Sequence, residues 1–423
     1  MKTRRQILED QKIAEERRIA RRNSRRTISR RNLRRTIPRR NLRSSPTSLN
    51  EGFNADLLPI DLIISILSRL PVKSIAICRC VSKLWSSILT RTEFTDLVSV
   101  RSKLLFVCNK SMIYSSHQPQ DPDENPSSIV ANHHMNFPFG ICVVYSPVQG
   151  LICFKTRPIL PEGKCTVLVI CNPSTGQSLT LPKVKTKKVE VISFFGYDPI
   201  EKQFKVLSMT RPRFGINKDS CGEYQVMTLG TNGWRMIECS TLHYPLSDGI
   251  CINGVVYYLA AVQGFEGKSK IACFDIRSEM FMFIEKAKPE RAKLVNYMGK
   301  LATVRSNNWP FAICGDTRSL ELCVLEDAEK QKWTTHTYVL PHLWKEDIVG
   351  EVRLYIIGVT RTGEVVLSPY IPPELTYFIY YNLERNTITK VDLQGLDGLM
   401  YDKVEAFLDH AEDVKLGGVF RTP

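Results

Sequence analysis

A Gly-Lys-Ser run is the first place where this sequence suggests chemistry. Gly267-Lys268-Ser269 matches the end of a phosphate-binding loop. However, Val262 occupies the position where that loop requires its first glycine. Neither a Gly-x-Gly-x-x-Gly motif nor a His-Glu-x-x-His motif occurs in the chain. We therefore expect no nucleotide-loop, dinucleotide or zinc-protease chemistry.

Histidines, carboxylates and cysteines give no stronger signal. His133-His134 lacks partners at ligand spacing, so we expect an exposed loop there rather than a metal site. Asp198, Asp275 and Asn382 stand in turn contexts, where side-chain oxygens accept bonds from nearby backbone N–H groups. The 13 cysteines never show Cys-x-x-Cys spacing, which is typical of buried thiols in a reducing compartment. Cysteine thioester chemistry stays open, because surroundings rather than spacing define a reactive thiol.

Length and hydropathy bound the kind of protein that can hold these residues. The 423 residues are 43% hydrophobic, which allows one large core or two unequal domains. The longest apolar run, 250–262, contains Asn253 and Gly254 and falls short of the ~18 uninterrupted residues that a membrane span needs. Because the first ten residues are charged, a signal peptide is not expected. We expect a soluble intracellular protein with no catalytic residue, no metal and no cofactor.

Most of the positive charge lies in the first 43 residues. They carry +13 of the formal +15, which leaves +2 for the other 380 residues. A nine-residue unit recurs there, RRNSRRTIS and then RRNLRRTIP, and its period places successive units on opposite sides of a helix. We therefore predict a disordered arm over 1–50 that serves as a nuclear localisation signal, a weak polyanion contact or a transit peptide. The arginines of the predicted nuclear signal are Arg21, Arg22, Arg25, Arg26, Arg30, Arg31, Arg34, Arg35, Arg39 and Arg40.

A helical pattern follows the arm. Leu62, Ile63, Ile66, Leu67 and Leu70 recur at spacings of three and four, after a proline that suits a first helical turn. Pro71 should end this helix, and two short helices are expected at 74–81 and 82–89. So small a helical unit buries too little surface to be stable alone, so we expect it to need a partner.

This segment resembles the plant F-box motif. The resemblance rests on Leu58-Pro59, on the run Ile66 to Pro71, and on Arg79-Cys80-Val81-Ser82-Lys83-x-Trp85, with Ala76-Ile77-Cys78 as a departure. In that family the helices bind a Skp-type adaptor, which bridges to a cullin scaffold. The resemblance implies an F-box domain over 51–98 and these adaptor-binding residues: Leu58, Pro59, Ile66, Leu67, Leu70, Pro71, Ser74, Arg79, Val81 and Trp85.

Residues 99–423 carry a repeated β pattern. Strand-turn-strand units have turns near Asn172, Thr228, Asp275, Glu326 and Asn382, about 50 residues apart, and each unit follows a strand opened by glycine. This period predicts a β-propeller of six to seven blades, with an irregular pair of β-sandwiches as the alternative. The stretches Asn172 to Gly176 and Gly196 to Pro199 also resemble the kelch-like F-box-associated domain of plants, which implies substrate binding. The expected fold class is α+β multidomain: disordered arm, three-helix F-box and all-β propeller-like domain.

The loops between the second and third strands of each unit form a candidate substrate surface. Successive loops of a propeller alternate between its two faces, so these loops should share the face opposite the turns. They are more basic than the rest of the body and hold aromatic side chains, a combination found in binding hot spots. The predicted substrate-binding residues are Arg211, Arg213, Phe214, Arg305, Trp309, Phe311 and Tyr370. We expect an acidic or phosphorylated protein segment as the ligand.

Two functions fit these features. The resemblances imply a non-catalytic substrate-recognition subunit of an SCF-type cullin-RING ubiquitin ligase, located in the nucleus or cytoplasm. The alternative is a nuclear protein that associates with nucleic acid through its basic arm. Salt distinguishes them, because binding by apolar helices survives moderate salt whereas binding by the arm weakens steeply.

Overall fold

The computed structural model describes most of the chain between residues 59 and 412. The gaps are 71, 79, 90, 92–93, 95–101, 109–111, 120–126, 138–139, 157–158, 161–162, 165–166, 185–190, 211–222, 263–268, 289–291, 308–311, 342–343, 351, 370–376 and 397–403. The predicted arm, 1–50, and the arginines of the nuclear signal lie outside the described residues.

Three short helices form where the helical pattern was expected. They are α2 (Ile60–Leu67), α3 (Val72–Cys78) and α4 (Lys83–Ile88). Pro59 is the N-cap of α2, and its carbonyl accepts bonds from the N–H groups of the first turn, so a proline fits there. Ser82 caps α4, because its Oγ accepts a 3.1 Å hydrogen bond from the Trp85 N–H.

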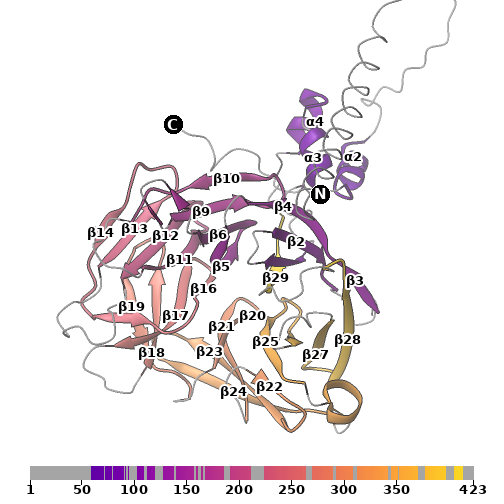
Figure 1. The fold of residues 1–423 in the computed structure, drawn as a ribbon, viewed down its shortest axis with the longest axis vertical. Helices are drawn as coiled ribbons and strands as arrows, with labels where there is room; N and C mark the ends of the chain where they lie inside the picture. Colours follow the sequence, from indigo (N-terminus) through magenta and orange to yellow (C-terminus); the bar gives the residue numbers. More distant parts are fainter. Residues whose placement is uncertain are drawn as a thin grey trace, which may run out of the picture. The chain divides into compact units, whose positions relative to one another are not determined.

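All but two of the described strands form six sheets of four to six strands, which we number as blades 1 to 6 and which are arranged around a central axis (Figure 1). Blade 1 contains, in spatial order, β29 (Val404–His410), β1 (Lys103–Cys108), β2 (Met112–His117) and β4 (Asn132–Asn136). Blade 2 contains β5 (Ile141–Val148), β6 (Leu151–Thr156), β9 (Val167–Asn172) and β10 (Gln177–Thr180). Blade 3 contains β11 (Val191–Asp198), β12 (Gln203–Thr210), β13 (Tyr224–Thr228) and β14 (Arg235–Ile237).

Blade 4 contains β15 (His243–Pro245) and β16 (Ile250–Ile252), both paired with β17 (Val255–Val262), then β18 (Ser269–Asp275) and β19 (Phe281–Ile284). Blade 5 contains β20 (Lys293–Tyr297), β21 (Lys300–Ser306), β23 (Ser319–Asp327) and β24 (Lys332–Val339). Blade 6 contains β22 (Ala312–Ile313), β25 (Leu354–Val359), β26 (Glu364–Pro369), β27 (Tyr377–Asn382), β28 (Thr387–Gln394) and β3 (Ser128–Val130). A π-helix, η3 (Trp344–Val349), lies between β24 and β25.

The hydrophobic core is divided among the contacts between neighbouring blades. Each adjacent pair of blades encloses its own cluster of buried apolar side chains, and one cluster joins blade 6 to blade 1. In the contact of blades 3 and 4, Phe194 stacks on Tyr258 with ring centroids 4.3 Å apart. Alternating strand residues face opposite neighbours, so every blade contributes to two clusters. The prediction of a propeller is therefore confirmed, with six blades, and the β-sandwich alternative is wrong.

Two different strand pairings close the ring between its first and last blades. The C-terminal strand β29 completes blade 1 by pairing antiparallel with β1, with His410 opposite Lys103. The second pairing involves β3, which lies between β2 and β4 in the sequence. β3 pairs in parallel with the outer edge of β28 and so belongs to blade 6. Each terminal blade thus contains a strand from the other end of the propeller sequence.

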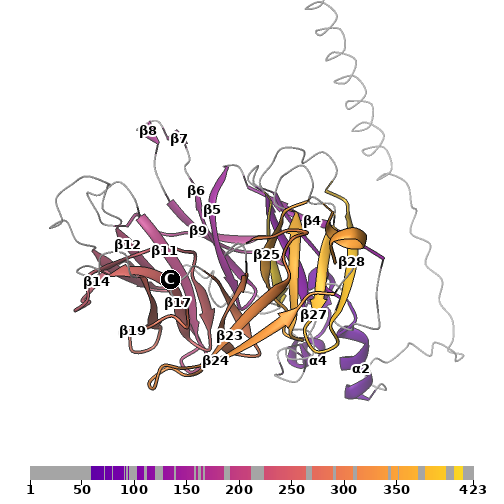
Figure 2. The same ribbon diagram turned by 90° about the horizontal axis from the view of Figure 1, so that it is seen from below.

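The strand order separates two faces of the propeller. In each antiparallel meander, the turns between strands one and two and between strands three and four lie on one face, which we call the turn face. The connections between strands two and three lie on the opposite, loop face. One of them carries the two-stranded ribbon of β7 (Ile159–Leu160) and β8 (Gly163–Lys164), which projects from the propeller in the edge-on view (Figure 2).

Glycine opens most second strands, with one exception. Gly150, Gly254 and Gly299 take φ of 79°, 86° and 82° in the tight turns between the first and second strands. Gly196 was likewise expected to open a strand, and this is wrong, since it lies inside β11. A Cβ there would come within 2.4 Å of the Ile276 side chain of blade 4, so this glycine permits close packing of two blades.

Candidate functional site

The three helices have a core of their own. Ile63, Ile64 and Leu67 of α2 pack with Ile75 of α3, Ile88 of α4 and the following Leu89 and Phe94. Burying a leucine or isoleucine side chain contributes about 1.5–3 kcal/mol, so this small cluster is what holds the helices to one another.

A second set of apolar side chains on these helices faces outward. Leu62 and Ile66 of α2 are half-exposed, at 51% and 54%, while Ile77 of α3 is 69% and Val81 62% exposed. The helix α2 is therefore apolar on two sides, one turned to the core and one turned away from it. Isolated exposed apolar residues are ordinary, but several on one small unit indicate a surface that a partner covers.

The predicted adaptor-binding residues fall into three groups. Pro59, Ile66 and Val81 are exposed, whereas Leu67 is buried in the helical core at 2% exposure. Leu70 and Trp85 are half-buried and pack against that core, and Ser74 is also half-buried. The other predicted residues, Leu58, Pro71 and Arg79, lie outside the described residues. Leu67 is therefore a core residue that holds α2 in place, and it is not itself on the surface. That these residues contact an adaptor stays a prediction.

Turns on the turn face are fixed by local side-chain bonds, as predicted for this residue type. The Asn172 Oδ1 accepts bonds from the Ser174 N–H at 2.9 Å and the Thr175 N–H at 3.2 Å. Asp198, Asp275 and Asn382 accept backbone N–H bonds two or three residues ahead in the same way. The Oδ1 atom of each side chain is occupied in shaping a turn, so the predicted side-chain to backbone bonds are confirmed.

The predicted substrate-binding residues are placed only in part. The strands that flank their loops end on the face opposite the turns. Six of the seven lie outside the described residues: Arg211, Arg213, Phe214, Trp309, Phe311 and Tyr370. Arg305 was expected in a loop, but it lies within β21 and its Nε donates a 2.6 Å hydrogen bond to Glu321 Oε2. This bond and the neighbouring Lys288 hold the pKa of Glu321 below its usual range.

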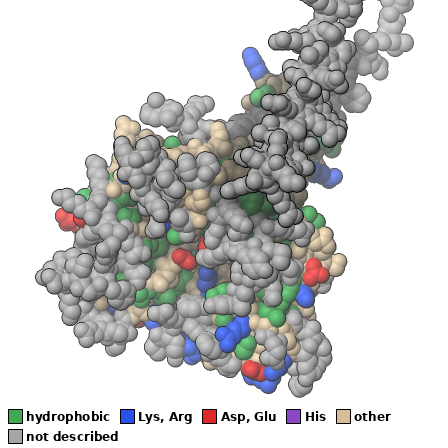
Figure 3. Space-filling model, viewed as in Figure 1, with side chains coloured by type: hydrophobic (Ala, Val, Ile, Leu, Met, Phe, Trp, Pro, Cys, Tyr) green, Lys and Arg blue, Asp and Glu red, His purple; other side chains and the backbone are tan. Residues whose placement is uncertain are grey.

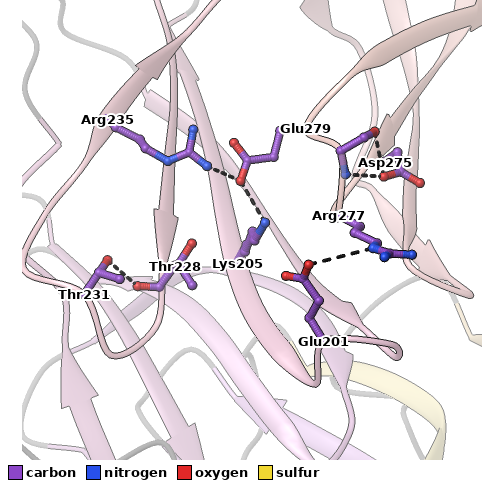
Figure 4. Close-up of polar contacts among 9 residues, drawn as sticks. Glu201, Lys205, Thr228, Thr231, Arg235, Asp275, Arg277 and Glu279 are labelled. Carbon is purple, nitrogen blue, oxygen red and sulfur yellow. Dashed lines mark hydrogen bonds and ion pairs between the residues drawn. The ribbon is translucent and has the colours of Figure 1, made fainter.

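An ion cluster joins blades 3 and 4 (Figure 4). The Oε1 atom of Glu279 accepts the Lys205 Nζ at 2.8 Å and also the Arg235 guanidinium. The Lys205 and Glu279 side chains are only 6% and 10% exposed, whereas Arg235 is half-exposed. A second pair, Arg277 with Glu201 at 3.8 Å, is exposed on both sides. The first pair is therefore a buried interblade contact and the second a solvated one.

A buried histidine connects the same two blades farther along their contact. His243 Nε2 lies 2.6 Å from the Tyr258 hydroxyl, and Nδ1 lies 2.9 Å from the Thr241 carbonyl. The carbonyl can only accept, so Nδ1 donates to it. Burial lowers the pKa of His243 to about 4, so the ring is neutral near pH 7 and Nε2 accepts from the tyrosine. Nothing in the sequence around this histidine indicated the network, since Tyr224 and Tyr258 come from distant strands.

Further chemistry is limited in the described residues. No group of three or more His, Cys, Asp or Glu side chains is arranged there to hold a metal ion. His133 and His134, expected in a loop, lie in β4, where His134 Nε2 bonds Ser115 Oγ at 2.6 Å. Burial raises the pKa of the Cys273 thiol to about 12, so it is protonated and a poor nucleophile. Among the described helices, none is long and apolar enough to cross a membrane.

Charged side chains are interspersed on the face seen in Figure 3, where Lys and Arg gather along the lower rim and a few Asp and Glu lie among them. Among the side chains drawn in colour there, charges of both signs are mixed.

Comparison with known proteins agrees with this description. The F-box domain model matches residues 56–97, and the model of the F-box associated beta propeller domain matches residues 103–411. The chain is 48% identical over 383 residues to the F-box protein DOR of Arabidopsis thaliana, covering 88% of this chain and 96% of that protein. It is 45% identical over 386 residues to the F-box protein At5g65850 of the same plant, covering 88% of this chain and 93% of that one. The three helices and the six-bladed ring are thus the two parts of a known architecture, and the chain belongs to the plant F-box proteins with an F-box-associated β-propeller domain.

Proposed function

We propose that this chain is the substrate-recognition subunit of an SCF-type cullin-RING ubiquitin ligase. The helices α2 to α4 bind a Skp-type adaptor, and through it a cullin scaffold, while the propeller binds a protein substrate. The chain itself carries no catalytic step, because ubiquitin transfer belongs to its partners. A role in substrate recognition fits the F-box and propeller domains and the relatives of this chain.

One observation supports this most strongly: Leu62, Ile66, Ile77 and Val81 are exposed on a helical unit whose core is already filled by other residues. Apolar side chains that are not needed for the core, yet exceed half exposure on so small a unit, favour a partner that removes them from water. Covering each would contribute on the order of 1 kcal/mol, at about 25 cal/mol per Å².

The test is co-purification with a plant Skp-type adaptor after co-expression. We expect Leu62→Asp with Ile66→Asp to abolish recovery of the adaptor, since two charges would be buried against apolar surface. The matched control is Ile200→Asp, which changes an isoleucine of 66% exposure in the propeller and should leave recovery unchanged. Full adaptor recovery by a folded double variant would contradict the proposed surface.

For the substrate we propose the loop face. Its loops at 157–166, 211–223 and 307–318 have ten or more residues, whereas several turns of the opposite face are tight and fixed by their own side chains. Apart from Arg305, the basic and aromatic residues identified from the sequence belong to loops of this face, and they suit an acidic or phosphorylated segment. Alanine replacement of Arg211, Arg213 and Trp309 together should lengthen the half-life of the substrate without loss of adaptor binding. An unchanged half-life would rule out this face.

A further inference from the structure

The outermost strand of blade 5 has an open edge. Of the strands that the structure describes, only β23 pairs with β24, which runs along the outer rim of the propeller (Figure 1). β24 has eight residues, whereas the outermost strands β10, β14 and β19 have four, three and four. Blade 6 has an equally long fourth strand, β28, and there β3 covers its edge. Among the described strands, one long outer strand thus has its edge covered and the other has no partner on its outer edge, where the Tyr381 hydroxyl donates to the Val339 carbonyl at 3.4 Å.

The direction of the backbone groups on β24 follows from one hydrogen bond. The Leu340 N–H donates to the Arg318 carbonyl at 3.0 Å, directly after the opposed pair Val339 and Ser319. In an antiparallel ladder, every second residue turns its N–H and C=O to the partner strand. Counting back from Leu340, these are the even-numbered residues of β24. Thr335 and Thr337 therefore turn their N–H and C=O groups to the open edge.

The sequence of this edge does not block the addition of a strand. Natural edge strands are commonly protected by charged residues, proline or a bulge. Residues 333–339 contain no Asp, Glu, Lys, Arg, Pro or Gly, and the one irregularity in the pairing lies before them, between Leu325 and Asp327. Thr335, His336 and Thr337 are exposed, and Val339 is 66% exposed.

We propose that β24 pairs antiparallel with β24 of a second copy of this chain, around a two-fold axis through His336. The axis position follows from two requirements: the outward-facing residues must oppose one another, and the pairing must use all of 333–339. Thr335 then lies opposite the partner's Thr337, and the two such pairs share four backbone hydrogen bonds. The two sheets of four strands become one sheet of eight. This dimer is independent of adaptor and substrate binding.

The side chains favour this register over others. Trp333 and Val339 share one side of the strand, because they are six residues apart. In the proposed pairing, each Val339 lies opposite the partner's Trp333, whose half-buried ring packs on the contact of blades 4 and 5 and donates from Nε1 to the Glu285 carbonyl. The most exposed apolar side chain of the strand thus packs against the part of that ring that is still exposed. The β-branched threonines face one another, and the two Lys332 residues lie at opposite ends of the ribbon. Since one strand pairing is a small interface, we expect a weak dimer with a dissociation constant in the micromolar range.

Thr337→Pro tests the hydrogen bonds. Its N–H faces the open edge, so proline removes a bond between copies while sparing the ladder to β23. Sedimentation velocity of the full chain, from about 1 to about 200 µM, should show a concentration-dependent dimer for the natural sequence. The proline substitution is present in both copies, so the dissociation constant of the dimer should rise at least about 10-fold. Thr337→Val keeps the N–H and the branched side chain, so it should dimerise as before.

A cysteine cross-link tests the register and stands even if the proline variant fails to fold. His336 of the two copies forms a non-hydrogen-bonded pair with Cα atoms about 4.5 Å apart, within the range for a disulfide. Mild oxidation of His336→Cys should give a covalent dimer, with the 336–336 link identified by peptide mass mapping. Lys332→Cys is the control, because its two copies lie about 26 Å apart. A chain that stays monomeric over this range, an undiminished dimer of a folded Thr337→Pro variant, or equal cross-linking of both cysteine variants would overturn the proposal, even if β24 bound another extended peptide.

Discussion

Replacing Glu279 by glutamine should expose how much the interblade ion cluster contributes to stability. Lys205 is 6% exposed and its Nζ lies 2.8 Å from Glu279 Oε1, so the substitution leaves a buried ammonium without its counter-charge. Breaking a buried pair from one side costs about 3–5 kcal/mol. Glutamine keeps an oxygen at the same place as an acceptor, so we expect the lower end, about 3 kcal/mol. The half-exposed Arg235 regains water and adds little.

The assay is urea unfolding followed by tryptophan fluorescence. With a slope of about 3 kcal/mol per M, Glu279→Gln should lower the transition midpoint by about 1 M. Glu201→Gln is the matched control, because its partner Arg277 is 3.8 Å away and both side chains are about half exposed. That control should change the stability by less than about 0.5 kcal/mol. Equal effects of the two substitutions would refute the reasoning.

A double variant separates the charge from the packing. Lys205→Met with Glu279→Leu removes both buried charges and keeps similar volumes, so it should be more stable than Glu279→Gln alone. If the double variant is less stable than Glu279→Gln, the ion cluster contributes net stability to the propeller. In that case its role is not limited to each buried charge neutralising the other.

Other outcomes follow from the described residues and from the sequence of the basic arm. The pKa of His243 is about 4 when folded and about 6.5 when unfolded, so stability is complete above the unfolded value and falls as the pH drops towards 4. At pH 5 this loss should be about 2 kcal/mol in urea unfolding, and His243→Gln should reduce the pH dependence. Leu67→Ala should cost about 2–5 kcal/mol and melt the three helices, seen as reduced adaptor recovery with an unchanged propeller transition. Gly196→Ala should destabilise the propeller by about 1–3 kcal/mol, because its Cβ meets the side chain of Ile276, and an unchanged midpoint would contradict that contact. Deleting residues 1–43 should abolish nuclear accumulation and salt-sensitive heparin binding while adaptor binding persists.

Features that depend on a few neighbouring residues could be predicted from the sequence. The turns at Asn172 and Asp275 are set by a side chain that bonds the backbone two or three residues ahead, and such a motif can be recognised locally. The blade period was recognisable for the same reason, because each outer hairpin repeats that local pattern. The period and the length of the domain predicted six to seven blades, and the structure has six, of which blade 1 lacks a recognisable turn signal.

Features that depend on contacts between distant residues could not be predicted in this way. The helical pattern identified Ile63 and Leu67 together with Leu62 and Ile66, but periodicity alone does not say which side of an all-apolar helix meets the core. Gly196 was assigned to the start of a strand, because no local signal shows that Ile276, far along the chain, packs against this position. Arg305 was assigned to a loop since the end of β21 has no local signal, and its partner Glu321 comes from another strand.

The double closure of the ring also sets an order of events during synthesis. β1 emerges early from the ribosome, but its partner β29 follows about 300 residues later, which at about 5–20 residues per second takes about 15–60 s. Over nearly the same interval β3 waits for β28. During most of translation β1 therefore has one edge unpaired and β3 has no partner strand, and neither terminal blade is complete until the other end of the domain has been made. The nascent chain must be shielded from strand addition by other chains during that time.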